Sequence, residues 1–303
     1  MTREFAVGFI GFGEAGFNIA KGLKSAGLQH IFAYDINTHS PDLGPRIQQR
    51  ARESQIMLVD SSDELARSAD VLFSTVTADQ DRKAAEQTAP FLEARHIYAD
   101  LNSVSPALKQ AVEQIVVSRS AGFVEVAVMA PVPPYGHRVP MLLGGKAAAA
   151  FVELMAPYGM RLEVISEKVG TAAATKMFRS IVVKGLEALM LECVLGASLY
   201  DADDRVFASL AESFPGIDWK RLANYMISRV VVHGERRARE MEEVAETLEE
   251  IGIEPIMADA TARRQEWCSQ LGLSAEFGPN GPENYRDLLE AIRKQNKHIK
   301  SMI

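Results

Sequence analysis

The sequence predicts an α/β protein, with a mostly parallel sheet covered by helices in its first part and an all-helical second part. Up to about residue 165, short apolar runs alternate with stretches of helical period, which is the pattern of βαβ units. The runs are apolar nearly throughout, as in strands that are buried on both faces of a sheet. After Val169 the strand signals stop and only helical period continues. We therefore expect two domains, residues 1–168 and residues 169–303.

The strand candidates follow one another along the first domain, and the second domain is divided by turns. The strand candidates are "FAVGFIG" (5–11), "HIFAYD" (30–35), "IMLV" (56–59), "VLFSTV" (71–76), "HIYADL" (96–101), "FVEVAV" (123–128), "PMLLGG" (140–145) and "RLEVI" (161–165). The helical breaks are expected at "SFPGIDW" (213–219), "GIEP" (252–255) and "FGPNGPEN" (277–284), because Pro and Gly do not continue a helix.

The composition is that of an ordinary globular chain. Of the 303 residues, 47% are hydrophobic and 24% are charged, and the net charge is −7. A net negative charge opposes binding to nucleic acid or to anionic membranes, so a small molecule is the expected partner. Cys193 and Cys268 lie far apart without metal-ligand spacing, so we expect no disulfide framework and no metal site. With neither a signal peptide nor an apolar run of about 20 residues, a cytoplasmic location is expected.

A glycine-rich turn follows the first strand candidate. The stretch "VGFIGFGEAGFNIAKGL" places Gly11, Gly13 and Gly16 in a GxGxxG spacing between an apolar strand and an amphipathic helix. Gly11 permits the tight turn, Gly13 lets the backbone approach a pyrophosphate, and Gly16 lets the helix pack closely on the strand. The free amides and the positive dipole end of the helix favour phosphate. The first domain is therefore predicted to be a Rossmann-type, dinucleotide-binding domain. The other cofactor-binding candidates on this turn are Phe12, Glu14 and Ala15.

Asp35 ends the second strand candidate and is the expected ribose ligand. It follows Gly16 by 19 residues. A carboxylate at this place accepts hydrogen bonds from both ribose hydroxyls and repels a 2′-phosphate. The following "INTHS" supplies no arginine for such a phosphate, so NAD is favoured over NADP. Thr75 and Val76, at the end of "VLFSTV", are further cofactor-binding candidates.

With these motifs the sequence resembles the β-hydroxyacid dehydrogenase superfamily, which includes 3-hydroxyisobutyrate and 6-phosphogluconate dehydrogenases. The resemblance spans nearly the whole chain and is closest to members with a phosphogluconate-dehydrogenase-like helical domain. It implies an NAD(P)-dependent oxidoreductase that transfers hydride between the cofactor and a β-hydroxyacid-type substrate, bound in the cleft between the two domains. Three further stretches carry the resemblance.

The first of these stretches is "DLNSVSP" (100–106), which is similar to the family's substrate motif D-x-S-T-x-x-P. Asn102 and Ser103 stand at the Ser-Thr pair, which implies that both bind substrate and that Asn102 also lies near the cofactor. Ser105 can cap a helix that begins at Pro106, so free amides and polar side chains meet at this edge. A helix cap without a binding role is the alternative.

The second stretch departs from the family. In "FVEVAVMAPVPPYGHRVPMLLGG", Met129, Ala130 and Pro131 stand where relatives carry the substrate-binding Ser-Gly-Gly. Loss of the hydroxyl and gain of prolines predict a stiffer, more apolar loop and a differently shaped substrate. His137 and Arg138 either contact an acid group of the substrate or are surface residues of a turn.

The third stretch is "GTAAATKMFRSIVVKG" (170–185), which is similar to G-x-G-x-x-x-K-x-x-x-N. Lys176 matches the catalytic lysine, and burial would lower its pKa toward the range of a general base. Ser180 replaces the usual Asn one turn on and is implied to orient the substrate. Lys184 lies about 12 Å from Lys176 along the helix axis, so we interpret it as an interface or salt-bridge lysine.

A weaker match concerns Arg239. Together with Glu240 it stands at a Lys-Asp pair of the family, which implies a place near the cofactor. The alternative is a solvated helix with i,i+4 ion pairs, such as that of Arg239 with Glu243. For Arg236 and Arg237 we favour this solvated face.

The sequence thus favours an NAD-dependent dehydrogenase with Lys176 as general acid/base. A decarboxylating phosphogluconate-like dehydrogenase and an imine reductase are alternatives within the fold, and a non-catalytic dinucleotide-binding sensor is an alternative of another class. Lys176 argues against the imine reductase, in which this lysine is usually replaced, and against the sensor. The resemblance also implies a homodimer through the helical domain, for which residues 181–197 are the candidate surface. Burial of that run within its own domain is the alternative.

Overall fold

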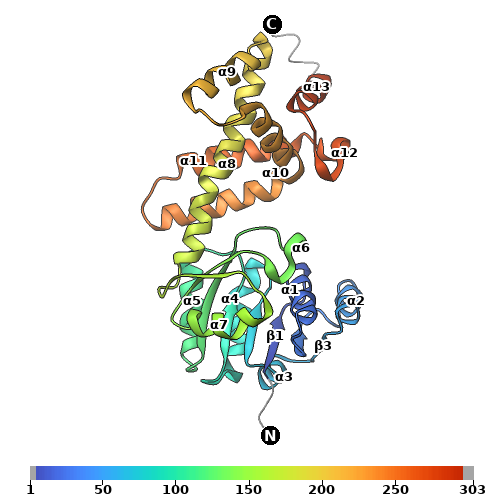
Figure 1. The fold of residues 1–303 in the computed structure, drawn as a ribbon, viewed down its shortest axis with the longest axis vertical. Coiled ribbons are helices and arrows are strands. Elements are labelled where there is room, and N and C mark those ends of the chain that lie inside the picture. The colour runs from blue at the N-terminus through green and yellow to red at the C-terminus, as the bar shows by residue number, and fades with distance from the viewer. Residues whose placement is uncertain (1–4, 296–303) are drawn as a thin grey trace. The chain divides into compact units, whose positions relative to one another are not determined.

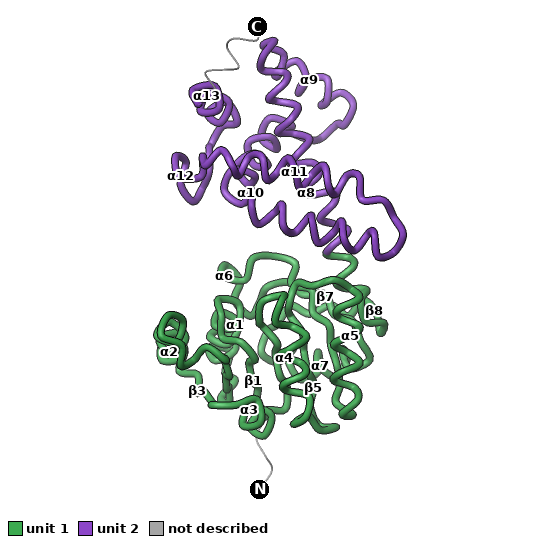
Figure 2. Tube along the Cα trace, turned by 180° about the vertical axis from the view of Figure 1, so that it is seen from behind, with its two compact units in different colours: residues 1–176 green, residues 177–303 purple. Residues whose placement is uncertain are grey.

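The computed structural model describes residues 5–295, which form two compact units. Unit 1 comprises residues 1–176 and unit 2 residues 177–303 (Figure 2). The division falls within helix α8 (Thr171–Ala197), a little later than the predicted boundary. The reason is that the first backbone amides of α8 are hydrogen-bonded to a side chain of unit 1, as described below.

Unit 1 is built on an eight-stranded sheet with the order β3-β2-β1-β4-β5-β6-β7-β8. Neighbouring strands are parallel except β6 and β7, so the predicted mostly parallel sheet is confirmed. Every predicted run overlaps one strand. The central strands β1, β4 and β5 are buried on both faces, whereas the edge strands β3 and β8 are partly exposed. The strands are β1 (Ala6–Ile10), β2 (His30–Tyr34), β3 (Met57–Leu58), β4 (Val71–Ser74), β5 (Ile97–Asp100), β6 (Gly122–Val128), β7 (Met141–Gly144) and β8 (Leu162–Ser166).

Helices cover both faces of this sheet (Figure 1). On β4, Phe73 points into a core shared with α1, α2 and α7, whereas Leu72 points into a core shared with α3, α4 and α5. Alternate side chains of one strand thus serve opposite cores, as the two-residue period requires. The helices are α1 (Glu14–Ser25), α2 (Gly44–Ser54), α3 (Ser62–Ser68), α4 (Asp81–Thr88), α5 (Pro106–Val117), α6 (Val132–Tyr135) and α7 (Ala148–Met155).

Unit 2 is helical throughout its described residues, as predicted. After α8 it contains α9 (Asp203–Ser213), α10 (Trp219–Glu250), α11 (Ile256–Gln270), α12 (Ser274–Phe277) and α13 (Tyr285–Gln295). The three predicted breaks lie between α9 and α10, between α10 and α11, and between α12 and α13. Helices α10 and α11 approach closely at Gly234, where an added Cβ would lie 2.9 Å from the Gln265 carbonyl oxygen. None of the helices in residues 5–295 is long and apolar enough to cross a membrane.

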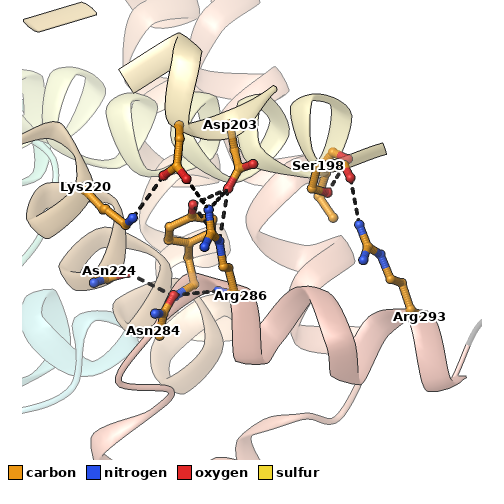
Figure 3. A network of polar contacts seen from close by, with 10 residues as sticks. Ser198, Asp203, Lys220, Asn224, Asn284, Arg286 and Arg293 are labelled. Carbon is orange, nitrogen blue, oxygen red and sulfur yellow. Dashed lines mark hydrogen bonds and ion pairs between the residues drawn. The ribbon is translucent and has the colours of Figure 1, made fainter. Parts of the chain in front are cut away.

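A polar network joins α9, α10 and α13 (Figure 3). The Asp203 carboxylate accepts hydrogen bonds from the Tyr285 hydroxyl and, at 2.9 Å, from Arg286. Arg286 also donates to Asp204 at 2.8 Å, and Asp204 in turn pairs with Lys220 at 2.9 Å. The hydrogen bond from Tyr285, followed by those from Arg286, lowers the pKa of Asp203. One carboxylate pair therefore links three helices that contribute to the core of unit 2.

Buried charges lie between α8, α10 and α11, where the sequence led us to expect a solvated face. Arg237 is 4% exposed and pairs with Glu187 at 2.8 Å, so the solvated interpretation is wrong for this residue. Gln265 donates a further hydrogen bond to Glu187 at 3.3 Å. Lys184 is also buried and forms an ion pair with Glu240 at 2.8 Å, which agrees with a salt-bridge lysine. Arg237 is buried because α8 and α11 cover the face of α10 on which it lies.

The apolar run of α8 divides between two faces. Leu191 and Val194 are buried in the core of unit 2, which supports burial within its own domain for these side chains. Val182 and Leu189 are exposed. Pairing of two copies through the exposed face stays a prediction.

Candidate functional site

A pocket of about 440 Å³ opens at the carboxyl ends of β1, β2 and β4. Ligands of doubly wound sheets bind at this edge, where neighbouring strands lead to opposite faces. Most of the cofactor candidates from the sequence line the pocket: Gly11, Gly13, Glu14, Ala15, Asp35, Thr75 and Val76. Sequence reasoning missed other lining residues, among them Ile36, Asn37, Gln80 and Lys83. The only sequence signal for these residues is their position: Ile36 and Asn37 follow β2, Gln80 directly precedes α4, and Lys83 lies in the first turn of α4.

The glycine turn fits a dinucleotide pyrophosphate. Gly11 has a φ of 81°, and a Cβ there would lie 2.8 Å from the Thr75 carbonyl oxygen. A Cβ on Gly16 would lie 2.6 Å from Thr75 Oγ1, so the turn and β4 leave no room for side chains at these two positions. A Cβ on Gly13, by contrast, would meet nothing within 4 Å. Helix α1 begins here without a side-chain cap, so its first amides are directed toward the open space over Gly13.

Asp35 lines the pocket and also supports the glycine turn. Its Oδ2 accepts a hydrogen bond from the Phe12 amide at 2.8 Å, and its Oδ1 accepts one from the Asn37 amide at 2.9 Å. The Phe12 side chain is fully buried and does not line the pocket, so its expected cofactor contact is limited to its backbone. Arg50 of α2 reaches the Phe12 carbonyl oxygen at 3.3 Å. Burial, followed by the charge of Arg46, lowers the pKa of Arg50, and the charges of Glu14 and Asp35 oppose this shift.

Lys176 contacts the loop that follows β5. Its Nζ donates a hydrogen bond to Ser103 Oγ. Ser103 is exposed, and Lys176 is partly buried. The loop is fixed by the helix cap that the sequence predicts, since Ser105 Oγ accepts a hydrogen bond from the Leu108 amide at 3.2 Å. The structure thus brings together two candidates that are 73 positions apart in the chain. Ser180 lies one turn beyond Lys176 on α8, within unit 2.

Asn102 faces the protein interior. Its Nδ2 donates to Ser74 Oγ at 2.9 Å and to Asp81 Oδ1 at 2.8 Å, and its backbone amide donates to Asp100 Oδ1 at 3.0 Å. Both amide hydrogens are used inside unit 1, so none is left for a substrate carboxylate. Asn102 therefore holds the ends of β4 and β5 and the start of α4 together, while the neighbouring Ser103 contacts Lys176.

Two carboxylates and one lysine form a buried cluster beneath Asn102. Asp81 and Asp100 are 0% exposed and Lys109 is 1% exposed. Lys109 Nζ lies 2.8 Å from Asp100 Oδ1 and donates to the Asp100 carbonyl oxygen at 3.0 Å. Burial, followed by the charge of Asp100, raises the pKa of Asp81 to about 7, against the opposing effects of Lys109 and Asn102. One lysine thus faces two carboxyl groups, and burial beside Asp100 makes Asp81 hold its proton to a higher pH than an ordinary aspartate does.

We expect the free energy of unfolding to fall as the pH rises through about 7. The pKa of Asp81 in the fold lies above its ordinary value of 3.8, so its contribution to stability is complete below about pH 4, declines while only the carboxyl of the unfolded chain ionises, and is lost once the pH has risen through about 7. Urea unfolding of the wild type and of Asp81→Asn between about pH 5 and about pH 9 measures this. The variant should lack the decline, because its amide does not ionise. An equal decline in both proteins would assign it to another group.

The comparisons with known proteins agree with this geometry. Residues 6–152 match the NAD binding domain of 6-phosphogluconate dehydrogenase, and residues 197–268 match a domain of unknown function. A conserved hypothetical protein from Sinorhizobium meliloti 1021 is 34% identical, with 97% of each chain covered and a TM-score of 0.85. A conserved protein of unknown function, described as structurally similar to 3-hydroxyacid dehydrogenases, is 28% identical over 88% of this chain and 97% of its own, with a TM-score of 0.77.

The chain belongs to the β-hydroxyacid dehydrogenase superfamily. A 3-hydroxyisobutyrate dehydrogenase from Mycobacterium tuberculosis shares the fold at 14% identity, with 95% and 99% of the two chains covered and a TM-score of 0.71. Family and fold together indicate an NAD(P)-binding oxidoreductase of the 3-hydroxyacid dehydrogenase type.

In this member of the superfamily, the loop after β6 packs against α1. Met129 and Ala130 are partly buried, and Pro131 is exposed just before the short helix α6, which lies beside α1 (Figure 1). Their contact with substrate stays a prediction.

His137 is buried where α1 carries Gly22, so the surface interpretation is wrong for it. A Cβ on Gly22 would lie 2.2 Å from His137 Nδ1, which shows how closely the ring approaches the helix. Burial, followed by the charge of Arg138, lowers the pKa of His137. Arg138 itself is exposed, as a turn residue is expected to be. The contact of His137 with α1 depends on a helix more than a hundred residues earlier, which no local pattern predicts.

Arg239 lies on the exposed side of α10. It donates to Glu242 at 3.1 Å, in an i,i+3 ion pair. Its place near the cofactor, which the resemblance implies, stays a prediction. Within residues 5–295 no group of three or more His, Cys, Asp or Glu side chains is arranged to hold a metal ion.

Proposed function

We propose that this protein is an NAD-dependent dehydrogenase that transfers hydride between NAD and a β-hydroxyacid-type substrate, with Lys176 as the general acid/base. The observation that carries the proposal is the hydrogen bond from Lys176 to Ser103. It holds an amine at the end of β5, on the same sheet edge as the pocket that fits the dinucleotide. Acids and bases in such positions typically contribute about 10²- to 10⁴-fold to the rate.

Lys176 and Ser103 have complementary roles in the reaction. When bound, NAD supplies the hydride acceptor for the hydrogen on the carbinol carbon. Neutral Lys176 donates a hydrogen to Ser103 Oγ, which orients its lone pair toward the substrate hydroxyl. Lys176 Nζ takes the hydroxyl proton as the carbonyl bond forms. The alcohol thus loses one hydride to NAD and one proton to Lys176. In the reverse direction the ammonium of Lys176 returns the proton to the oxygen.

The preference for NAD rests on Asp35. We expect NADH to bind about tenfold more tightly than NADPH, a difference of about 1.4 kcal/mol, and the difference to shrink in Asp35→Asn. The substitution removes the charge that repels a 2′-phosphate, and the amide oxygen still accepts a hydrogen bond from Phe12 or Asn37. Fluorescence titration of both dinucleotides measures the two affinities.

The matched control for Asp35 is Asp42→Asn, which neutralises an exposed carboxylate of the following loop. It should leave the ratio of the two affinities unchanged. Tighter binding of NADPH than of NADH to the wild type would contradict the assigned preference for NAD. It would instead favour Arg50, which lies at the same turn, as a ligand of the 2′-phosphate.

A further inference from the structure

Glu125 is a carboxylate in the middle of the buried strand β6. It is 0% exposed, and its strand neighbours Val124 and Val126 are both buried in the core that α1, α2 and α7 share with the sheet. A buried carboxylate is costly unless hydrogen bonds to its oxygens compensate for the lost water. Its partners therefore indicate why a charge is retained at this position.

The partners of Glu125 are the first backbone amides of α8. Oε1 accepts hydrogen bonds from Gly170 at 2.8 Å and from Ala172 at 2.9 Å, and Oε2 accepts one from Ala173 at 3.3 Å. The first amides of a helix have no carbonyl partner within the helix, and its N-terminus carries a partial positive charge. Glu125 thus satisfies three donors and opposes the dipole of α8, so it fixes the start of this helix to the sheet.

The surroundings leave room for one carboxylate. Gly144 on β7 stands opposite Glu125 in the antiparallel register, and a Cβ there would lie 2.2 Å from Oε1. The other ionisable groups whose charges interact here are Glu113 of α5 and Lys146 after β7. Burial raises the pKa of Glu113, with Lys146 opposing and Glu125 adding to the shift.

We propose that Glu125 is a positioning residue for Lys176. Lys176 lies on α8 one turn beyond the amides that Glu125 binds, so the anchor that fixes the first turn also fixes the direction in which the lysine points toward Ser103. The catalytic meaning of this inference rests on the proposed function, whereas the placement of the lysine does not.

The test compares the chemical reactivity of Lys176 in the wild type, Glu125→Gln and Glu125→Asp. The three proteins are treated with acetic anhydride over a range of pH, and the acetylation of each lysine is followed by peptide mass spectrometry. Glu125→Gln should label Lys176 about three- to tenfold faster, because loss of the anchor weakens the hydrogen bond that holds the amine to Ser103 and makes the amine more accessible. Glu125→Asp keeps a carboxylate that can accept hydrogen bonds from the first amides, so its rate should lie closer to that of the wild type.

One internal standard, Lys83, and one control variant, Glu167→Gln, make the result specific to Lys176. Lys83 is exposed on α4 and should label equally in all three proteins. Glu167→Gln removes an exposed carboxylate just before α8 and should leave Lys176 unchanged, because solvent screens its charge. Unchanged labelling of Lys176 in both Glu125 variants would overturn the inference. An equal acceleration at Lys83 would do so as well, since it would show a general loosening of unit 1.

The labelling requires neither substrate nor turnover. A negative result therefore leaves the dehydrogenase proposal standing, and a protein without dehydrogenase activity still permits the measurement. With a substrate in hand, Glu125→Gln should lower kcat about tenfold or more and leave the KM for NAD within about twofold, since the dinucleotide pocket lies at β1, β2 and β4.

Discussion

Replacement of Lys176 by alanine is expected to lower kcat at least about a hundredfold, while the affinity for NADH stays within about twofold. The substitution removes the group that exchanges the hydroxyl proton. It leaves the glycine turn, Asp35 and the rest of the dinucleotide pocket intact, because Lys176 does not line that pocket. Titration with NADH measures affinity, and turnover is measured on a panel of β-hydroxyacids and their oxo partners with both dinucleotides.

The control for this variant is Lys168→Ala, which removes an exposed lysine from the segment just before α8. It should retain both kcat and NADH affinity. A kcat within about threefold of the wild type in Lys176→Ala would reject the acid/base role. Loss of NADH affinity alone, with kcat retained, would instead assign Lys176 to cofactor binding.

Replacement of Lys109 by methionine is expected to lower the free energy of unfolding by about 3–5 kcal/mol. Lys109 is the cation that neutralises the buried pair of Asp100 and Asp81, and methionine of similar length leaves their charges uncompensated. Urea unfolding at about pH 8 should show the full loss, and a lower pH should show less, because the carboxyl groups can then take up protons. The double variant with Asp100→Asn should regain part of the stability.

The matched control for Lys109 is Lys21→Met, which breaks an exposed ion pair with Glu53 at the same distance of 2.8 Å. Because solvent screens exposed pairs, this loss should stay below about 1 kcal/mol. Equal losses in the two variants would show that burial does not determine the effect.

The strands of unit 1 and the breaks of unit 2 were predictable because their signals are local. An apolar run between turn residues, a GxGxxG turn after a strand and a Pro-Gly break each depend on a few neighbouring residues. The cap at Ser105 is of the same kind, since donor and acceptor are three positions apart. The family motifs placed Lys176 and Ser103 among the candidates for the same reason.

The buried charges were not predictable in this way. Arg237 stands among charged residues on its own helix, with Glu240 three positions later, yet α8 and α11 bury it against Glu187 and Gln265. A charged residue within the apolar run "FVEVAV" was a signal that something must compensate Glu125, but its partners lie 45 or more positions later. Asp81 and Lys109 likewise meet only because β4, β5 and their helices are neighbours in the sheet.

Local sequence patterns suffice for the two kinds of domain, the glycine turn with Asp35, the helix cap at Ser105 and the superfamily to which the chain belongs. The inward direction of Asn102, the contact of Lys176 with Ser103 and the anchoring of α8 by Glu125 follow from the three-dimensional arrangement alone. The physical reason is that secondary structure follows the period of a short segment, whereas the ionisation and direction of a side chain depend on groups that the fold brings to it from distant parts of the chain.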